Sequence, residues 1–242
     1  LKKPKFWDLK KPNYLAYLLL PLTILIKLNI FISNLYPKNK FDKIKTICIG
    51  NIYLGGTGKT PTTLKLYQLL KDENYKVVSA KKFYSNHQDE YLLLKNKSQV
   101  ISLKNRKEII KHAIEKNYEL IIFDDGLQDK TIDYNLKFVC FDSQNLIGNG
   151  FLIPAGPLRE KINSLRKYDG VILKNLDKNK DLSKIISKIK SINPKIEIFN
   201  TYVKIKNIDT FERSNQFLIF SGIGNSTSFK EILIKNDFNI VE

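Results

Sequence analysis

The chain has 242 residues, of which 43% are hydrophobic, and it carries a formal net charge of +17. This length and composition suffice for one large or two small domains with a buried core. Its two cysteines, Cys48 and Cys140, lie in apolar strand-like runs, so we expect buried free thiols in a reducing compartment, which excludes a disulfide framework and a cysteine metal site. The lysine excess favours an anionic partner, which is nucleic acid, an anionic membrane surface or a phosphorylated substrate. The sequence has no basic block interleaved with aromatic residues of the kind that single-strand binders use, so no nucleic acid partner is expected.

Residues 1–37 form the first predicted unit, an apolar membrane-associating helix. A lysine cluster and Phe6-Trp7 precede an apolar run over 14–26, which Lys27 interrupts and which continues to Leu35. The uncharged run is shorter than the ~20 residues that a spanning helix needs, and no small-residue cleavage site follows it. Basic and aromatic residues beside an apolar helix favour a segment lying in the membrane interface over a helix packed on the body of the protein. A single spanning helix stays an alternative.

Strands and helices alternate from residue 38 onward. The pattern predicts strands at 44–49, 76–80, 99–103, 119–124, 136–141, 169–174 and 196–203, and helices at 61–72, 88–96, 105–117, 160–167, 181–192 and 227–236. This alternation predicts an α/β fold with a mostly parallel sheet and helices on both faces. We expect a core over 38–208, after which a strand at 217–220 begins a smaller C-terminal α/β domain over 209–242.

The glycine-rich stretch from Gly50 to Thr60 is the most informative motif. It follows the strand predicted at 44–49 and opens onto the helix predicted at 61–72, which is the layout of a phosphate-binding P-loop. Glycines let successive amides point at one spot, and the helix N-terminus adds its partial positive charge there. We expect Lys59 to reach the β- and γ-phosphates of ATP and Thr60 to hold magnesium (Mg2+). The residues predicted to bind the nucleotide are Tyr53, Leu54, Gly55, Gly56, Thr57, Gly58, Lys59 and Thr60.

Carboxylates stand at the ends of two other predicted elements. The strand at 119–124 ends in Asp124 and Asp125, and a P-loop enzyme needs an acid at the end of a neighbouring strand to hold magnesium or its waters. Asp89 and Glu90 open the helix predicted at 88–96. Acids there complement the helix dipole, but a phosphotransferase also needs a carboxylate to orient or deprotonate the attacking hydroxyl. The nearby His87 is expected to be a solvated loop residue.

A Gly/Pro-rich loop at 148–160 delivers Arg159 and Glu160 to the start of the next predicted helix. An arginine there could stabilise charge on a transferring phosphate or bind an anionic substrate. The alternative is an ordinary crossover with a capping pair.

Taken together, four segments resemble the tetraacyldisaccharide 4'-kinase family, the lipid A 4'-kinases of Gram-negative envelope synthesis. They are 50–61, 89–90, 124–128 and 148–160. The Asp-Asp-Gly-Leu-Gln and Pro-Ala-Gly-Pro-Leu-Arg-Glu segments are highly specific. The resemblance runs in order over nearly the whole chain, and it includes the apolar amino-terminal helix, the shifted glycines of the P-loop and the turn at 221–225.

The resemblance implies transfer of the γ-phosphate of ATP to the 4'-hydroxyl of tetraacyldisaccharide 1-phosphate, a glycolipid, at the cytoplasmic face of the inner membrane. The product is lipid IVA, and the cofactors are ATP and Mg2+. Asp89 would be the catalytic base, and Glu90 with one of Asp124 and Asp125 would organise magnesium. The implied sites are catalytic Asp89, Lys59, Asp125 and Arg159, metal-binding Thr60, Glu90 and Asp124, and substrate-lining Gln128, Arg159 and Glu160.

The chain departs from the family pattern at several positions. Ser79-Ala80-Lys81-Lys82-Phe83-Tyr84 stands where the family has Arg-Gly-Tyr-Gly, Asp129 replaces a histidine and Tyr91 replaces a proline. A later family histidine would fall beyond Glu242, so the resemblance implies that the smaller C-terminal domain is incomplete here. Two other hypotheses stay open. One is another P-loop ATPase or small-molecule kinase at the membrane surface, and the other is a non-catalytic basic protein that binds nucleic acid or an anionic membrane.

Overall fold

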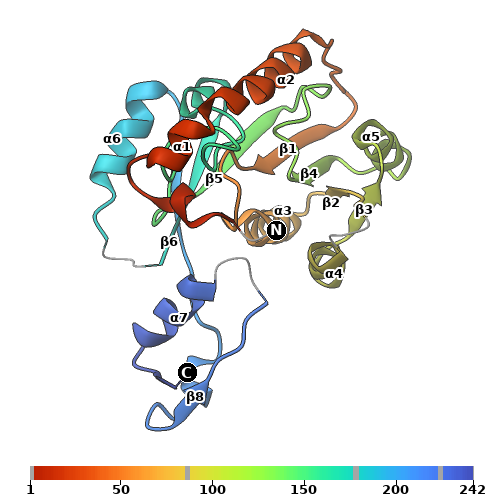
Figure 1. Ribbon diagram of the computed structural model, residues 1–242. Helices are drawn as coiled ribbons and strands as arrows, with labels where there is room; N and C mark the ends of the chain where they lie inside the picture. Colours follow the sequence, from red (N-terminus) through yellow and green to blue (C-terminus); the bar gives the residue numbers. More distant parts are fainter. Residues whose placement is uncertain (1–2, 85–87, 177–179, 223–225, 242) are drawn as a thin grey trace.

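A wholly parallel sheet of seven strands forms the centre of the computed structural model, which describes residues 3–84, 88–176, 180–222 and 226–241. The strand order is β3-β2-β4-β1-β5-β6-β7 (Figure 1). Their bounds are β1 (Lys45–Gly50), β2 (Val77–Lys82), β3 (Val100–Leu103), β4 (Leu120–Asp124), β5 (Leu136–Asp142), β6 (Gly170–Asn175) and β7 (Glu197–Tyr202). All seven predicted strands are confirmed, with their ends shifted by at most one or two residues.

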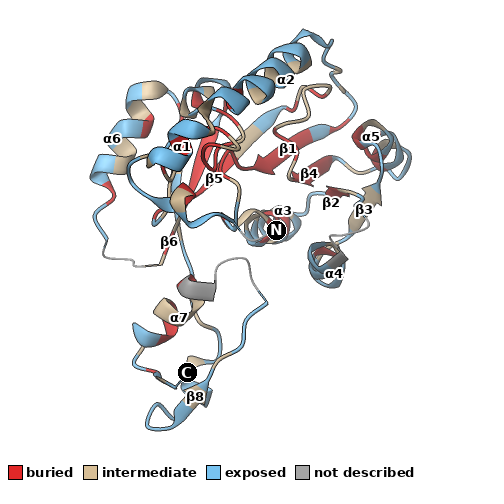
Figure 2. Cartoon of the chain, viewed as in Figure 1, coloured by how far each residue is buried: buried red, intermediate tan, exposed pale blue. Residues whose placement is uncertain are grey.

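Successive side chains of a strand point to opposite sides of the sheet, and apolar side chains on both sides are buried in this protein. On β4, Ile121 and Phe123 join one apolar cluster while Ile122 joins another. The helices α5 (Arg106–Glu115) and α6 (Ser183–Ile192) contribute to the first cluster, and α3 (Lys59–Asp72) contributes Tyr67 to the second. Figure 2 shows that buried residues concentrate in the strands between these layers. The continuous apolar runs of the sequence reflect this two-sided burial.

One predicted helix is wrong in type. The segment predicted as a helix at 160–167 is a 3-10 helix, η3 (Ile162–Lys167). Glu160 accepts a hydrogen bond from the Tyr168 hydroxyl at 3.1 Å, and both residues are buried. The segment between them is therefore held at both ends, and a short 3-10 helix connects these ends. Asn163 and Ser164 also have low helix propensity. The helix α4 (Gln88–Lys97) follows the prediction closely.

The amino-terminal segment consists of several short helices rather than one. These are η1 (Lys5–Asp8), α1 (Tyr14–Leu18), η2 (Leu20–Leu22) and α2 (Thr23–Leu35), and the break falls at Pro21, which lacks an amide donor. Along α2 only Thr23 is buried, whereas Leu25, Phe31 and Leu35 are more than 60% exposed. Figure 2 shows most of α2 in the colour of exposed residues. Most of the apolar surface of the helix is therefore exposed, and only the face of Ile26, Ile30 and Ser33 is partly buried. Within the described ranges, no helix has the length and apolar character required to cross a bilayer.

After β7 the chain leaves the sheet and forms a small unit at one end of the molecule (Figure 1). It contains η4 (Ile208–Thr210), β8 (Gln216–Leu218), α7 (Ser226–Ile234) and β9 (Asn239–Val241), with β8 and β9 paired in parallel. The rings of Phe211, Phe217 and Phe238 pack edge to face at its centre. The assignment of 209–242 as a separate domain stays a prediction. Residues 223–225 of the predicted turn lie outside the described residues.

Candidate active site

The glycine-rich loop connects β1 to α3, as the motif predicts. Gly58, immediately before the helix, has φ +88°, a left-handed conformation that favours glycine. The buried Asn51 side chain donates to the carbonyls of Tyr53 at 2.6 Å and Gly55 at 3.3 Å, so it braces the loop from inside. Among the described residues, no hydrogen bond uses the amides of Gly55, Gly56 or Gly58. These amides can therefore serve an anion at the N-terminus of α3.

Two of the predicted nucleotide-binding residues, Tyr53 and Leu54, hold the glycine-rich loop against the 148–160 loop. The Tyr53 side chain packs with Leu152 and Leu158, and its hydroxyl hydrogen-bonds Asp8 of the amino-terminal segment. The Leu54 amide donates to the Pro157 carbonyl at 2.8 Å. The contacts of Tyr53 and Leu54 thus give no support to a direct role in nucleotide binding. Thr57 is buried, and its amide donates to the Gly55 carbonyl at 3.0 Å.

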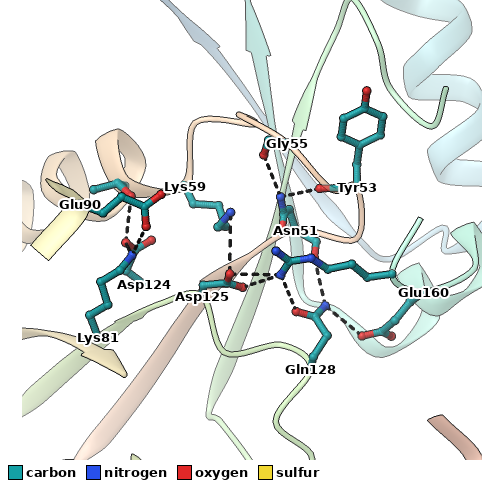
Figure 3. A network of polar contacts seen from close by, with 12 residues as sticks. Asn51, Tyr53, Gly55, Lys59, Lys81, Glu90, Asp124, Asp125, Gln128 and Glu160 are labelled. Carbon is teal, nitrogen blue, oxygen red and sulfur yellow. Dashed lines mark hydrogen bonds and ion pairs between the residues drawn. The ribbon is translucent and has the colours of Figure 1, made fainter. Parts of the chain in front are cut away.

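The two consecutive carboxylates at the end of β4 face different partners (Figure 3). The Asp124 side chain is fully buried, and its Oδ2 accepts from Thr60 Oγ1 at 2.9 Å. Asp125 has φ +66°, and its carboxylate lies 3.9 Å from Lys59 Nζ and 3.1 Å from Arg159 Nη1. Burial would raise the pKa of Asp125, but the charges of Lys59 and Arg159 outweigh burial and hold that pKa below its usual value. Asp124 therefore lies beside the predicted metal ligand Thr60, and Asp125 lies beside the two cations.

The oxygens around Thr60 fit a magnesium ion. Asp124 Oδ1 is buried and has no hydrogen-bond partner, so it offers an unused hard ligand beside the Thr60 hydroxyl. Magnesium in phosphate-transfer sites takes one or two carboxylates and completes its shell with phosphates and water. In the part of the chain that the structure describes, no three His, Cys, Asp or Glu residues form a group that could hold a metal ion.

Lys81, at the end of β2, connects Asp124 to the predicted metal ligand Glu90. Its Nζ lies 2.7 Å from Asp124 Oδ2 and 2.5 Å from Glu90 Oε2. Glu90 belongs to the first turn of α4, as does Asp89. Asp89 is exposed and makes no polar contact with the described residues, and the neighbouring His87 lies outside them. The structure therefore places Glu90 in contact with Lys81. Asp89 is the preceding residue of α4, and it makes no polar contact with the other predicted site residues that the structure describes.

A second network joins the P-loop to the 148–160 loop. Gln128 donates to the Asn51 carbonyl at 3.0 Å and to Glu160 Oε1 at 3.2 Å, and it accepts from Arg159 at 3.2 Å (Figure 3). Glu160 is 4% exposed and also accepts from Lys130. Glu160 is therefore a buried support, and Arg159, whose side chain is 25% exposed, is the member of this network that can reach a ligand.

Sequence reasoning missed the supporting residues of the site. Asn51, Lys81 and Lys130 each make contacts that order a predicted site residue. Of these, Lys81 had a signal in the sequence, because it stands in the segment that replaces the family's Arg-Gly-Tyr-Gly. Asn51 also had a signal, because it lies in the 50–61 segment that carries the family resemblance, whereas no local pattern indicated Lys130.

Comparison with known proteins identifies relatives of the whole chain. Residues 15–242 match the family described as tetraacyldisaccharide-1-P 4'-kinase. A tetraacyldisaccharide 4'-kinase from Pelagibacter ubique is 46% identical over 243 residues, which cover 100% of this chain and 76% of that relative. A tetraacyldisaccharide 4'-kinase from Rickettsia conorii is 35% identical over 257 residues, which cover 98% of this chain and 76% of that relative.

A solved structure shares the fold. The apo form of LpxK from Aquifex aeolicus in complex with ATP matches with a TM-score of 0.69 and 22% sequence identity, covering 93% of this chain and 80% of that chain. At this identity the likeness establishes the α/β P-loop fold alone. The sequence matches, which extend through both the loop and the acidic segments, favour the lipid kinase over the other two hypotheses.

Proposed function

Because the chain belongs to the tetraacyldisaccharide-1-P 4'-kinase family, we propose that it transfers the γ-phosphate of ATP to the 4'-hydroxyl of tetraacyldisaccharide 1-phosphate, which yields lipid IVA. One observation carries the proposal. The carboxyl ends of the adjacent strands β4, β1 and β5 and the loops that follow them bring Lys59, Thr60, Asp124, Asp125 and Arg159 to one edge of the sheet. Ligands of open parallel sheets bind at this edge.

The cations of the site divide the phosphate charge between them. Lys59 holds the β- and γ-phosphates together with the amides of Gly55, Gly56 and Gly58. Arg159 stabilises the charge that develops on the transferring phosphoryl group. Asp125 positions both cations, since its carboxylate lies within 4 Å of each. Thr60 and Asp124 would hold a magnesium ion, which neutralises charge on the phosphate oxygens when it is bound.

The acceptor hydroxyl needs a base. We assign this role to Asp89, which stands exposed at the start of α4, next to Glu90. Its carboxylate takes the proton of the 4'-hydroxyl as the oxygen forms a bond to the γ-phosphorus. The bond from that phosphorus to the β–γ bridging oxygen breaks, and ADP leaves with the electron pair.

The acceptor is a lipid, so the enzyme must work at a bilayer surface, and we infer the cytoplasmic face of the inner membrane. Two observations support attachment through the amino-terminal segment. Apolar side chains of α2 are exposed rather than packed on the body, and the chain carries an excess of lysine that attracts anionic lipid.

A transfer assay tests this function with two matched variants. Purified chain, γ-labelled ATP, magnesium and tetraacyldisaccharide 1-phosphate are combined in mixed micelles. Lys59→Met is expected to weaken ATP binding at least tenfold, because a hydrogen bond to a charged group contributes about 1.5–3 kcal/mol. Asp89→Asn is expected to bind ATP normally and to transfer at least a hundredfold more slowly, which is the lower range for a general base. Normal transfer by Asp89→Asn would contradict the assignment of the base.

A further inference from the structure

A buried ammonium group lies between the two carboxylates that the sequence assigns to the metal. The Lys81 side chain is 7% exposed, and its Nζ contacts Asp124 of β4 and Glu90 of α4 at once (Figure 3). Two carboxylate oxygens, at 2.7 Å and 2.5 Å, thus surround the lysine nitrogen.

This arrangement is poorly explained as a structural ion pair. Burying a lysine has a desolvation cost, and apolar residues of similar volume often replace buried ion pairs without loss of stability. Asp124 Oδ2 accepts from both Lys81 Nζ and Thr60 Oγ1, whereas Asp124 Oδ1 has no partner. One oxygen of the metal-site carboxylate is thus already occupied by a cation of the protein itself.

A divalent ion held by Thr60 and Asp124 would lie close to this ammonium, and the two positive charges would repel each other. Lys81 differs from an arginine here, because an ammonium is a point charge on a flexible stem and can leave a carboxylate without losing a paired, planar contact. Nucleotide phosphates next to Thr60 would offer the ammonium a new anionic partner.

We propose that Lys81 is a positioning residue that occupies the metal site of the nucleotide-free protein. It holds Asp124 and Glu90 in place and keeps free divalent ions out, and its ammonium turns to the phosphates when the nucleotide arrives with its metal. Magnesium then enters together with ATP rather than before it. The inference rests on the proposed function for the identity of the ligands, but metal binding without nucleotide tests it separately from phosphate transfer.

The test measures Mn2+ affinity of the nucleotide-free full chain by electron paramagnetic resonance. The variants are Lys81→Met, which keeps the volume and removes the charge, and Lys82→Met, which removes the same charge one residue away. A merely supporting neighbour of a metal site costs roughly 10–100-fold in metal affinity when it is lost. We expect metal affinity to rise instead. Lys81→Met should bind Mn2+ about tenfold tighter than the wild type, and the affinity of Lys82→Met should be unchanged. Equal, weaker or undetectable binding by Lys81→Met overturns the proposal.

Two further measurements extend the test, and the first of them keeps the inference testable if Lys81→Met does not fold. Lys81→Arg retains the charge and can engage both carboxylates with its planar fork, so it should bind Mn2+ more weakly than the wild type. Tighter binding by Lys81→Arg contradicts the proposal. In the presence of EDTA, ATP affinity of the folded Lys81→Met chain should fall about tenfold relative to Lys82→Met, because a charge-assisted contact with phosphate is lost. Equal ATP affinity refutes the movement of the ammonium to the phosphates.

Discussion

Substituting Gly148 by alanine should detach the amino-terminal segment from the loop that carries Arg159. Gly148 has φ +55°, and a Cβ atom there would lie 2.2 Å from the Trp7 carbonyl oxygen and 2.8 Å from Pro157 Cγ. The same carbonyl accepts the Asn149 amide at 2.9 Å. Because the nearest atom belongs to the backbone, the added methyl group cannot be accommodated by a side-chain rotation.

The cost has three parts. A left-handed conformation costs alanine about 1–2 kcal/mol. Overpacking a fixed site costs about 1–3 kcal/mol. Loss of the hydrogen bond to Trp7 adds about 0.5–1.5 kcal/mol. Gly148→Ala should therefore lower the free energy of unfolding by about 3–6 kcal/mol, and a domain of this size loses roughly 2–4 °C of Tm per kcal/mol.

Gly150→Ala is the matched control for this substitution. Gly150 has φ +81°, but the nearest atom to its added Cβ is Ile147 Cδ1 at 3.9 Å, so only the conformational cost of about 1–2 kcal/mol applies. Unfolding of both variants is followed by far-ultraviolet circular dichroism in urea and by heating. If Gly148→Ala is no less stable than Gly150→Ala, then Trp7 is not seated on the loop as described.

Two further predictions concern the membrane surface and pH. Leu25→Ser together with Leu28→Ser should reduce binding to anionic vesicles about tenfold or more, since about 0.8 kcal/mol is lost per apolar carbon removed from the interface. The ATP affinity of this double variant should not change. Undiminished vesicle binding would refute attachment through α2. The folded-state pKa of Asp125 lies below its unfolded value of about 3.9, so its stabilisation is present above that value and is lost as pH falls through the folded pKa. The stability difference between the wild type and Asp125→Asn, measured by urea unfolding from pH 7 to pH 2, should therefore shrink below about pH 4, and a difference that grows on acidification would contradict the contacts with Lys59 and Arg159.

The inner strands β1, β4 and β6 were predictable because each is buried on both faces and thus appears as an apolar run in the sequence. The P-loop was predictable from local spacing, and its left-handed Gly58 agrees with that prediction. Between Glu160 and Tyr168, which contact each other across eight residues, the pattern predicted the wrong type of helix. The apolar amino-terminal run was predicted as one helix, and its division into separate helices at Pro21 was not predicted.

The candidate site was likewise predictable in its residue types but not in its contacts. The sequence indicated Asp124 and Asp125 as a pair. The left-handed backbone at Asp125 turns the two side chains to different partners, so that Asp124 faces Thr60 and Asp125 faces Lys59. Residue types alone cannot show such a turn. The position of Lys81 between two carboxylates also depends on the pairing of β2 with β4 and on the placement of α4, neither of which a local pattern contains.

The identity of the phosphorylated hydroxyl decides whether the proposed function is right. The chain is incubated with magnesium, γ-labelled ATP and tetraacyldisaccharide 1-phosphate, and the lipid product is analysed by mass spectrometry and phosphorus NMR. We expect one added phosphate monoester at the 4'-position, with the label in that group and the 1-phosphate unchanged. Label in a diphosphate at position 1, or ATP hydrolysis with no labelled lipid, would contradict the proposed function.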